Sequence, residues 1–482
     1  AEAEAIRLPP LGCRAMGCGS SVKYKGASSS SECGGVVTWG SRLMGGSLDS
    51  GAWCAGLKEQ LGAGTLVLQV HATRGAFAAV LDGKGIVTWG SPDSGGDSSS
   101  VRDRLSGPML VKQVCNTRDA FAVLLDGGGV VTWGNPAKGG DSSSIQEQLN
   151  DKASVRQIFA TGHAFAAALD QGGVLTWGDE NKGAGNKTVK KQLIGLGQVT
   201  CIYPTKEDPD RGAFTATLQG GGVVFWGPPK NEDIFNVKKR LRGQVKVKQI
   251  CSTRGAFAVL LMDGSVVAWG STDYGGDSHA ARDQLTGKTP VLKLYSNDRA
   301  FAAALKSGAV ATWGSADYGG DSSRVKFELS GIAPINHVYS TSGAFAALLD
   351  GHGVVTWGHA AFGGDSGRVK DKLSGHPPIT RVYVNEGAFA VVLENGEVVT
   401  WGDLAKGGDC SHVQKQLGKA PIEHIYTTER AFAATFEGGG VVTWGHPDFG
   451  GDSSKLKKRL NSSVPVRQIF STRGAFAAVL DA

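Results

Sequence analysis

Seven arginines stand beside one recurring motif and are the residues best placed to bind a charged group. The motif reads Gly-Ala-Phe-Ala or a close variant, and each arginine lies one or two residues before its first alanine. A guanidinium group binds carboxylate, sulfate or phosphate through forked hydrogen bonds. The alternative is that each arginine is solvated or pairs with a neighbouring acid such as Asp119 or Asp298. We predict an anion-binding surface formed by Arg74, Arg118, Arg211, Arg254, Arg299, Arg430 and Arg473.

A second recurring polar residue is an aspartate that follows Gly-Gly in seven places. It could belong to a ring of metal ligands, or it could cap a short helix by accepting from its free N–H groups. One carboxylate per repeat lacks the several oxygen ligands that a calcium site requires. We therefore favour caps, and we predict no metal site and no cofactor. The aspartates are Asp97, Asp141, Asp277, Asp321, Asp365, Asp409 and Asp452.

No catalytic residue can be assigned from the sequence. The segment Gly364-Asp365-Ser366-Gly367 looks like the nucleophile segment of trypsin-like proteases, but it is a copy of the repeat. A triad is recognised by geometry, and no partner residues can be named. The ten histidines are scattered and form no H-x-x-x-H metal helix.

The eight cysteines fall into two groups. Four of them crowd the N-terminal end, where we predict two disulfides, and four cysteines allow three pairings. These are Cys13, Cys18, Cys33 and Cys54. Three others lie in strand-like runs and a fourth precedes an expected helix. For the three we expect buried free thiols. The four are Cys115, Cys201, Cys251 and Cys410.

A tandem repeat fills the chain and must position all these residues. A Trp-Gly pair recurs ten times, mostly at spacings of 43 or 44 residues, as from Trp89 to Trp133. The Ala-Phe-Ala motif also recurs ten times, from Phe77 to Phe476. Self-similarity at such a period is typical of repeat architectures, which grow by adding modules.

One unit predicts three strands and a short helix. Residues 247–251 are a short β-prone run, residues 256–261 are a continuous apolar run of strand length, and residues 266–269 follow a Gly-containing hairpin turn. Ser278 is placed to cap a helix that ends at Leu285. Because successive strand residues point to opposite faces, Phe77, Ala79 and Leu81 form a bulky face and Ala76, Ala78 and Val80 a small one. The bulky face of one sheet can then fill the small face of the next.

The two ends of the repeat region complement each other. Residues 36–40 form a returning strand without its partner, and residues 474–480 form the partner strand without a return. If they pair, the ring closes and no long sheet edge is exposed. We predict an all-β fold, a closed β-propeller of about ten short three-stranded blades with small peripheral helices. The alternative is that pairs of units merge into fewer blades, since propellers usually have four to eight.

The repeat resembles that of the RCC1 family. The resemblance rests on residues 249–258, Asp263-Gly264 and Trp269-Gly270, and on the Gly-rich loop after Tyr274. It covers residues 33–482 and implies a β-propeller. The units are shorter than usual for the family, as in its bacterial β-lactamase-inhibiting members. The founding member acts on a nuclear GTPase through an inserted wedge and an acidic face, and neither is visible in this sequence.

Bulk properties narrow the remaining choices. The 482 residues carry a formal charge of +6, which does not suggest a nucleic-acid partner. No apolar run approaches the ~18–20 residues needed to span a bilayer, so we expect no membrane contact. Residues 1–5 read AEAEA, resemble the spacer of a yeast secretion leader, and are treated as an expression scar. Residues 6–32 are expected to be a flexible extension. Secretion fits these features, although the sequence does not fix the native compartment.

Three function classes follow. The leading interpretation is a non-catalytic, monomeric binding scaffold that recognises a protein or an anionic glycan through one propeller face or the central channel. The second is an enzyme of hydrolase or lyase type, with its site in the channel or near the irregular units at residues 178–235, where the Gly-Gly-Asp signal is lost. The third is a structural or self-assembling repeat protein.

Overall fold

The computed structural model describes residues 36–480 with internal gaps. The expected expression scar, the extension at 6–32 and the four N-terminal cysteines lie outside the described residues. The gaps are residues 42–43, 45, 47–60, 62–64, 109, 151–154, 186–192, 194–196, 207, 209–210, 228–236, 238, 242–244, 352, 375–376 and 462–464.

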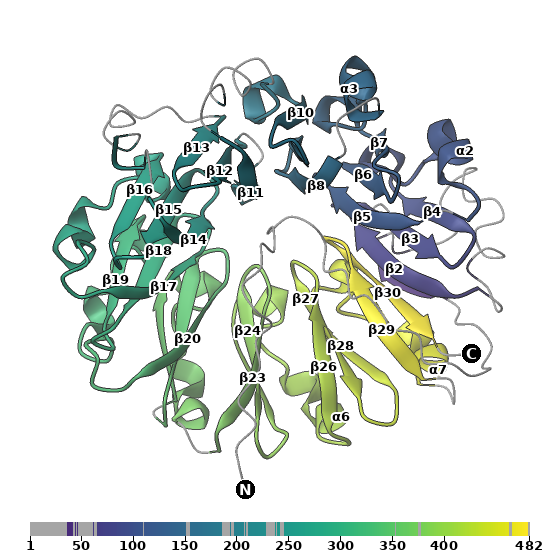
Figure 1. The fold of residues 1–482 in the computed structure, drawn as a ribbon. Coiled ribbons are helices and arrows are strands. Elements are labelled where there is room, and N and C mark those ends of the chain that lie inside the picture. Colours follow the sequence, from purple (N-terminus) through teal and green to yellow (C-terminus); the bar gives the residue numbers. More distant parts are fainter. Residues whose placement is uncertain are drawn as a thin grey trace, which may run out of the picture.

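Ten separate antiparallel sheets of three strands make up the fold. Figure 1 shows them side by side around a common centre, with the short helices on the outside. The prediction of an all-β chain with ten three-stranded units is confirmed, and the alternative of merged units is wrong. None of the ten sheets is closed on itself.

The strands follow the same order in each unit. The first strands are β2 (Val67–Ala72), β5 (Val111–Asn116), β8 (Val155–Ala160), β11 (Val199–Pro204), β14 (Val247–Ser252), β17 (Val291–Ser296), β20 (Ile335–Ser340), β23 (Ile379–Val384), β26 (Ile422–Thr427) and β29 (Val466–Ser471). The middle strands are β3 (Ala76–Leu81), β6 (Ala120–Leu125), β9 (Ala164–Leu169), β12 (Phe214–Leu218), β15 (Ala256–Leu261), β18 (Ala300–Leu305), β21 (Ala344–Leu349), β24 (Ala388–Leu393), β27 (Ala431–Phe436) and β30 (Ala475–Leu480). The third strands are β4 (Gly85–Gly90), β7 (Val130–Gly134), β10 (Val174–Gly178), β13 (Val223–Trp226), β16 (Val266–Gly270), β19 (Val310–Gly314), β22 (Gly353–Gly358), β25 (Val398–Gly402), β28 (Val441–Gly445) and β1 (Val36–Gly40).

The two ends of the described chain share one sheet. Strand β1 pairs antiparallel with β30, and Trp39 lies opposite Phe476, as Trp89 lies opposite Phe77 in the next unit. The predicted pairing of the first returning strand with the last strand is confirmed.

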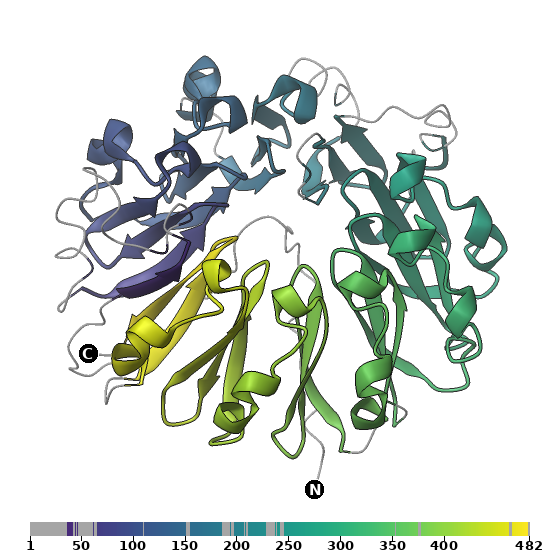
Figure 2. The same cartoon turned by 180° about the vertical axis from the view of Figure 1, so that it is seen from behind.

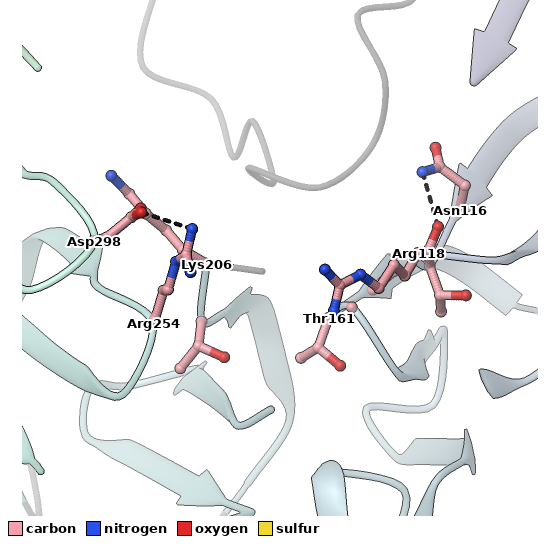
Figure 3. A pocket seen from close by; sticks show the side chains of 10 residues that line it. Asn116, Arg118, Thr161, Lys206, Arg254 and Asp298 are labelled. Atoms are coloured by element: carbon pink, nitrogen blue, oxygen red, sulfur yellow. Dashed lines mark hydrogen bonds and ion pairs between the residues drawn. The ribbon is translucent and has the colours of Figure 1, made fainter. Parts of the chain in front are cut away.

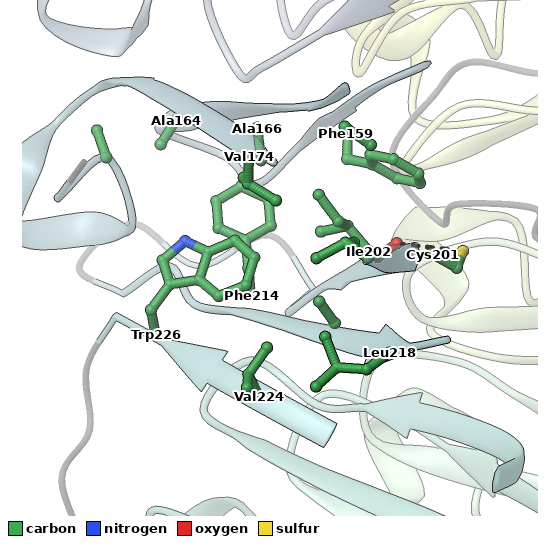
Figure 4. Close-up of a cluster of buried hydrophobic side chains, with 14 residues drawn as sticks. Phe159, Ala164, Ala166, Val174, Cys201, Ile202, Phe214, Leu218, Val224 and Trp226 are labelled. Atoms are coloured by element: carbon green, nitrogen blue, oxygen red, sulfur yellow. Dashed lines mark hydrogen bonds between the residues drawn. The ribbon is translucent and has the colours of Figure 1, made fainter. Parts of the chain in front are cut away.

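The core consists of ten apolar clusters, each between two neighbouring sheets. The bulky face of β3 packs with Phe77, Ala79 and Leu81 against the sheet of β1, while Ala76 and Ala78 meet the sheet of β6. Figure 4 shows the equivalent cluster between the sheets of β8–β10 and β11–β13, in which Phe159 and Phe214 are fully buried. The predicted packing of large faces on small faces is confirmed.

A tryptophan–glycine contact connects eight of the ten sheets to the one before them, whereas the buried indole N–H of Trp89 has no hydrogen-bond partner among the described residues. The Trp401 indole N–H donates to the Gly363 carbonyl oxygen at 3.1 Å, and Trp401 stacks on Phe389 of its own sheet at 4.9 Å. Gly363 has a φ of +90°, and an added Cβ would lie 2.7 Å from the Phe389 ring. The same indole hydrogen bond is made by Trp39, Trp133, Trp177, Trp226, Trp313, Trp357 and Trp444.

Glutamine side chains bridge some of the first strands. The Gln113 amide donates to the Ile158 carbonyl at 2.7 Å and accepts from its N–H at 2.9 Å. Gln249 makes the same pair of hydrogen bonds with Leu294. Each such amide satisfies two backbone groups of the neighbouring sheet, as buried polar groups require.

Short helical turns cover the outer strands (Figure 2). Among the described residues, the α-helices are α2 (Arg102–Leu105), α3 (Gln146–Asn150), α6 (Gln414–Leu417) and α7 (Lys457–Leu460). The 3₁₀ segments are η3 (Pro92–Ser94), η4 (Ser99–Val101), η5 (Pro136–Lys138), η6 (Ser143–Ile145), η7 (Glu180–Lys182), η8 (Thr272–Tyr274), η9 (His279–Gln284), η10 (Ala316–Tyr318), η11 (Ser323–Val325), η12 (Ala360–Phe362), η13 (Gly367–Leu373), η14 (Leu404–Lys406), η15 (Ser411–Val413), η16 (Pro447–Phe449) and η17 (Ser454–Leu456).

The recurring aspartates cap these turns. Asp277 Oδ1 accepts from the His279 N–H at 2.9 Å, whereas Ser278, the expected cap, makes no side-chain cap bond. The interpretation of these aspartates as caps is therefore confirmed at all seven places. The matching bonds are made by Asp97, Asp141, Asp321, Asp365, Asp409 and Asp452.

We predict that the glycine of the tryptophan–glycine contact tolerates no side chain. Gly363→Ala should lower the free energy of unfolding by about 1–3 kcal/mol more than Gly396→Ala, because only the first substitution overpacks the Phe389 ring. Gly396 has a similar φ of +82° with nothing within 4 Å of an added Cβ, so it isolates the backbone strain. Chemical denaturation of both variants measures the difference, and equal losses would contradict the packing role.

Candidate functional site

Four of the seven predicted arginines lie in equivalent turns on one face. Each follows a threonine at the end of a first strand, and the turns are tied to each other through the backbone. The Arg74 N–H donates to the Arg118 carbonyl at 2.9 Å, and the Arg254 N–H donates to the Asp298 carbonyl at 3.0 Å. These bonds fix the spacing between neighbouring turns. The four are Arg74, Arg118, Arg254 and Arg473.

Arg211 does not share this register, and Lys206 takes its place. Thr205 Oγ1 accepts from the Ala213 N–H at 3.1 Å, as the turn threonine Thr253 accepts from its own alanine. The residue after Thr205 is Lys206, because the insertion that follows it moves Arg211 along the turn. The sequence prediction for Arg211 counted back from the alanine and so missed the lysine.

Three of the arginines stack on aromatic rings. Arg211 lies over the Tyr274 ring at 4.7 Å, and Arg299 lies 5.0 Å from both the Tyr274 and Tyr318 rings. Arg430 lies 4.7 Å from the ring of Phe449. A guanidinium over a ring face is stabilised by cation–π attraction. The seven arginines therefore form two sets, one in the turns and one packed on aromatic side chains.

We call the surface that carries the turns of Arg74, Arg118, Arg254 and Arg473 the turn face. Acidic side chains neutralise part of its charge. Arg254 pairs with Asp298 at 2.8 Å, and Arg473 pairs with Glu429. Asp119 pairs with Lys138. The alternative prediction, that turn arginines pair with neighbouring acids, is confirmed for Arg254 and Arg473.

A cavity of about 350 Å³ opens among the turns of five neighbouring units. Figure 3 shows Arg118, Lys206 and Arg254 on its walls together with Asp298. Gly162 occupies the turn position that Arg118 occupies in the preceding unit. Because glycine has no side chain, the space at this position stays open. The lining residues are Asn116, Thr117, Arg118, Ala160, Thr161, Gly162, Thr205, Lys206, Arg254 and Asp298.

Lys206 is held in place by backbone carbonyls. Its Nζ donates to the Ser296 carbonyl at 2.7 Å, and its N–H donates to the Thr253 carbonyl at 3.0 Å. Burial lowers the pKa of the Lys206 amino group, the Asp298 carboxylate opposes this shift, and Arg254 adds to it. The Nε of Arg254 is buried without a hydrogen-bond partner among the described residues. An anion in the cavity would meet three cationic groups and one carboxylate that is already paired.

The irregular units identified in the sequence contribute directly to this cavity. Thr205 and Lys206 lie within the irregular residues 178–235, directly before the insertion. The only signal for Lys206 in the sequence was the break in the repeat, because no other unit has lysine after the turn threonine or asparagine.

The remaining predicted groups show structural roles where they are described. Cys115, Cys201, Cys251 and Cys410 are buried free thiols, which confirms the prediction for the first three. The described residues contain no group of three or more His, Cys, Asp or Glu side chains that could hold a metal ion. Within the same residues, no helix has the length and apolar character needed to cross a bilayer.

The chain matches no protein-family model and no curated protein. Among solved structures, it is similar to Prp20p from Saccharomyces cerevisiae at 13% identity and a TM-score of 0.36, over 96% of this chain and 93% of that one. Human WBSCR16 is 13% identical with a TM-score of 0.32, over 93% and 99% of the two chains. The Physcomitrella patens receptor kinase CR4 ectodomain is 11% identical with a TM-score of 0.32, over 59% and 70%. Membership of the RCC1 family stays a prediction.

We predict a pH-dependent stability that originates at His71. Burial lowers the pKa of His71 from 6.5 to about 4. Between these values the unfolded chain binds a proton that the folded protein does not, so the free energy of unfolding falls by about 3 kcal/mol as the pH is lowered through this window. His71→Cys, which copies Cys115 and Cys251 at the matching position, should remove this part of the pH dependence.

Chemical denaturation at pH values above and below this window measures the effect. Exposed His412→Gln is the control and should keep the dependence of the wild type. An equal loss of stability in wild type and His71→Cys on acidification would show that His71 is not responsible.

Proposed function

We propose that the protein is a non-catalytic binding scaffold whose turn face binds an anionic group of a protein or a glycan. The observation that carries this proposal is the cavity in which Arg118, Lys206 and Arg254 converge. Hydrogen bonds between cationic donors and carboxylate, sulfate or phosphate oxygens are roughly twice as strong as neutral ones.

The charge balance around the cavity supports an anion. Asp298 is the one carboxylate among the lining residues, and it is already paired with Arg254. Arg74 lies in the next turn and shares a backbone bond with Arg118, which extends the cationic surface beyond the cavity. Acidic or sulfated polymers carry anions at repeated intervals, and such an extended surface suits them.

We also propose that the ten sheets form one closed propeller. The pairing of β1 with β30 supports this, as do the contacts between the first strands of neighbouring sheets, including β2 with β29. Closure makes the turn face rigid, and a rigid set of cations loses little conformational entropy on binding. The monomeric state and the lack of a nucleic-acid partner remain predictions.

No specific observation favours the enzyme hypothesis. His163 lies beside the irregular unit, but its ring Nε2 donates to the Asp208 carbonyl at 2.8 Å, and burial lowers its pKa. That geometry ties the imidazole to the backbone as a neutral group. A self-assembling role likewise rests on the repeat alone.

The test is a titration of the protein with a sulfated oligosaccharide and with an acidic peptide. Arg118→Ser, which copies Ser342 at the matching turn position, should weaken binding of the recognised anion by about tenfold, and added salt should weaken it further. Gly162→Glu copies Glu386 and Glu429 at this position, and should also weaken binding because it introduces a carboxylate into the cavity.

Lys415→Ser on the outer helix α6 is the matched control, since it removes the same charge from an exposed site. It should leave the affinity unchanged. Equal effects of Arg118→Ser and Lys415→Ser would show that net charge, and not the cavity, governs binding. Failure of both anions to bind would contradict the proposal.

A further inference from the structure

A second, larger cavity lies at the periphery of the fold. It has a volume of about 1050 Å³ and shares no lining residue with the turn-face cavity. One wall comes from η10, η11 and the residues up to Ala333, and the other from β22, η12 and η13. Trp357 and Leu349 are its buried apolar walls. We call it the peripheral groove.

The repeat itself shows that the outer strand of this unit is unusually uncovered. Val354 lines the groove and is half-buried. The residue at the same register, three positions before the tryptophan, is buried in every other unit. These residues are Val36, Ile86, Val130, Val174, Val223, Val266, Val310, Val398 and Val441.

Two exposed apolar side chains line the same groove. Phe327 is 75% exposed and Ile332 is 63% exposed. The helix position of Phe327 is Asp, Glu or Lys in each of the other nine units, and Lys288 occupies the position of Ile332 in the preceding unit. Large apolar side chains scattered singly on a surface are ordinary, but a pair beside an apolar groove is typical of an interaction site. The nine charged counterparts are Glu59, Asp103, Glu147, Lys191, Lys239, Asp283, Asp371, Lys415 and Lys458.

The charges of the groove are mainly acidic. Four carboxylate residues line it against one arginine and one lysine, whereas the whole chain has a net charge of +6. The Ser323 N–H lowers the pKa of Asp321, which keeps that carboxylate charged at neutral pH. An apolar groove with an acidic rim is complementary to an apolar side chain flanked by cations. The charged lining residues are Asp317, Asp321, Glu328, Asp365, Arg324 and Lys370.

We propose that the peripheral groove binds a short segment of a partner protein, which inserts an aromatic or long aliphatic side chain beside Phe327 and Ile332 and carries lysine or arginine next to it. A small molecule held inside the groove would leave the exposed faces of these two side chains in water. A two-fold contact with a second copy would place one acidic rim against another, which is unfavourable. The inference is independent of anion binding on the turn face.

The test is a selection of random peptides from a phage library. The library is panned on the wild type and counter-selected on Phe327→Lys and Ile332→Lys, which copy the residues Lys239 and Lys288 of other units. Both substitutions lie at exposed positions, and a thermal melt checks that the variants are folded. We expect enriched peptides that combine one apolar anchor with lysine or arginine, and a loss of affinity of at least about tenfold in Phe327→Lys.

Met262→Lys is the matched control, because Met262 is 63% exposed but lies outside the groove. It should leave peptide binding unchanged. Three outcomes would overturn the proposal: no enriched peptide that depends on Phe327, a consensus rich in acidic residues, or a concentration-dependent increase in mass by light scattering that Phe327→Lys abolishes. The last outcome would make the groove an interface between copies of this chain.

Discussion

The contact between a tryptophan of one sheet and a glycine of the preceding sheet is the interaction on which the rest of the structure depends. The indole N–H reaches a backbone carbonyl that a left-handed glycine presents, and a phenylalanine of the tryptophan's own sheet fills the space where a Cβ would be, as for Trp401, Gly363 and Phe389. A small sheet needs a packed apolar face to be stable in water. The tryptophan–glycine contact helps to supply this packed face, because the buried indole N–H has an acceptor and the indole ring stacks on a phenylalanine.

This constraint also determines where variation is possible. The middle strands must alternate large and small side chains, and the glycine loops must keep their conformation, so neither can change without loss of packing. The exposed side chains of the turns and the outer helices carry no such restriction. The turn-face cavity and the peripheral groove both lie in these freer segments, at Arg118 and Lys206 in one case and at Phe327 in the other.

Much of the fold could be predicted from the sequence because its causes are local and repeated. The side-chain alternation in residues 76–81 and the aspartate that caps an outer turn in seven of the ten units depend on neighbours a few residues away. Lys206 could not be assigned to the turn position from the sequence. An insertion separates it from Ala213, and the spacing counted back from Ala213 selects Arg211 instead. The pairing of Arg254 with Asp298 joins two units, so the sequence could offer Asp298 only as an alternative partner and could not choose between pairing and a solvated arginine.

A repeat protein provides its own comparison, because ten units solve the same packing problem with nearly the same sequence. When a residue differs from its nine counterparts and the packing around it does not require the difference, we infer a constraint other than folding. Gly162 leaves a turn open where other units extend a side chain, and Phe327 is exposed where every other unit carries a charge. In both places the departure coincides with a cavity. Packing requires neither departure. The other units place a side chain at the turn position of Gly162 and a charged residue at the helix position of Phe327, and they fold in the same way.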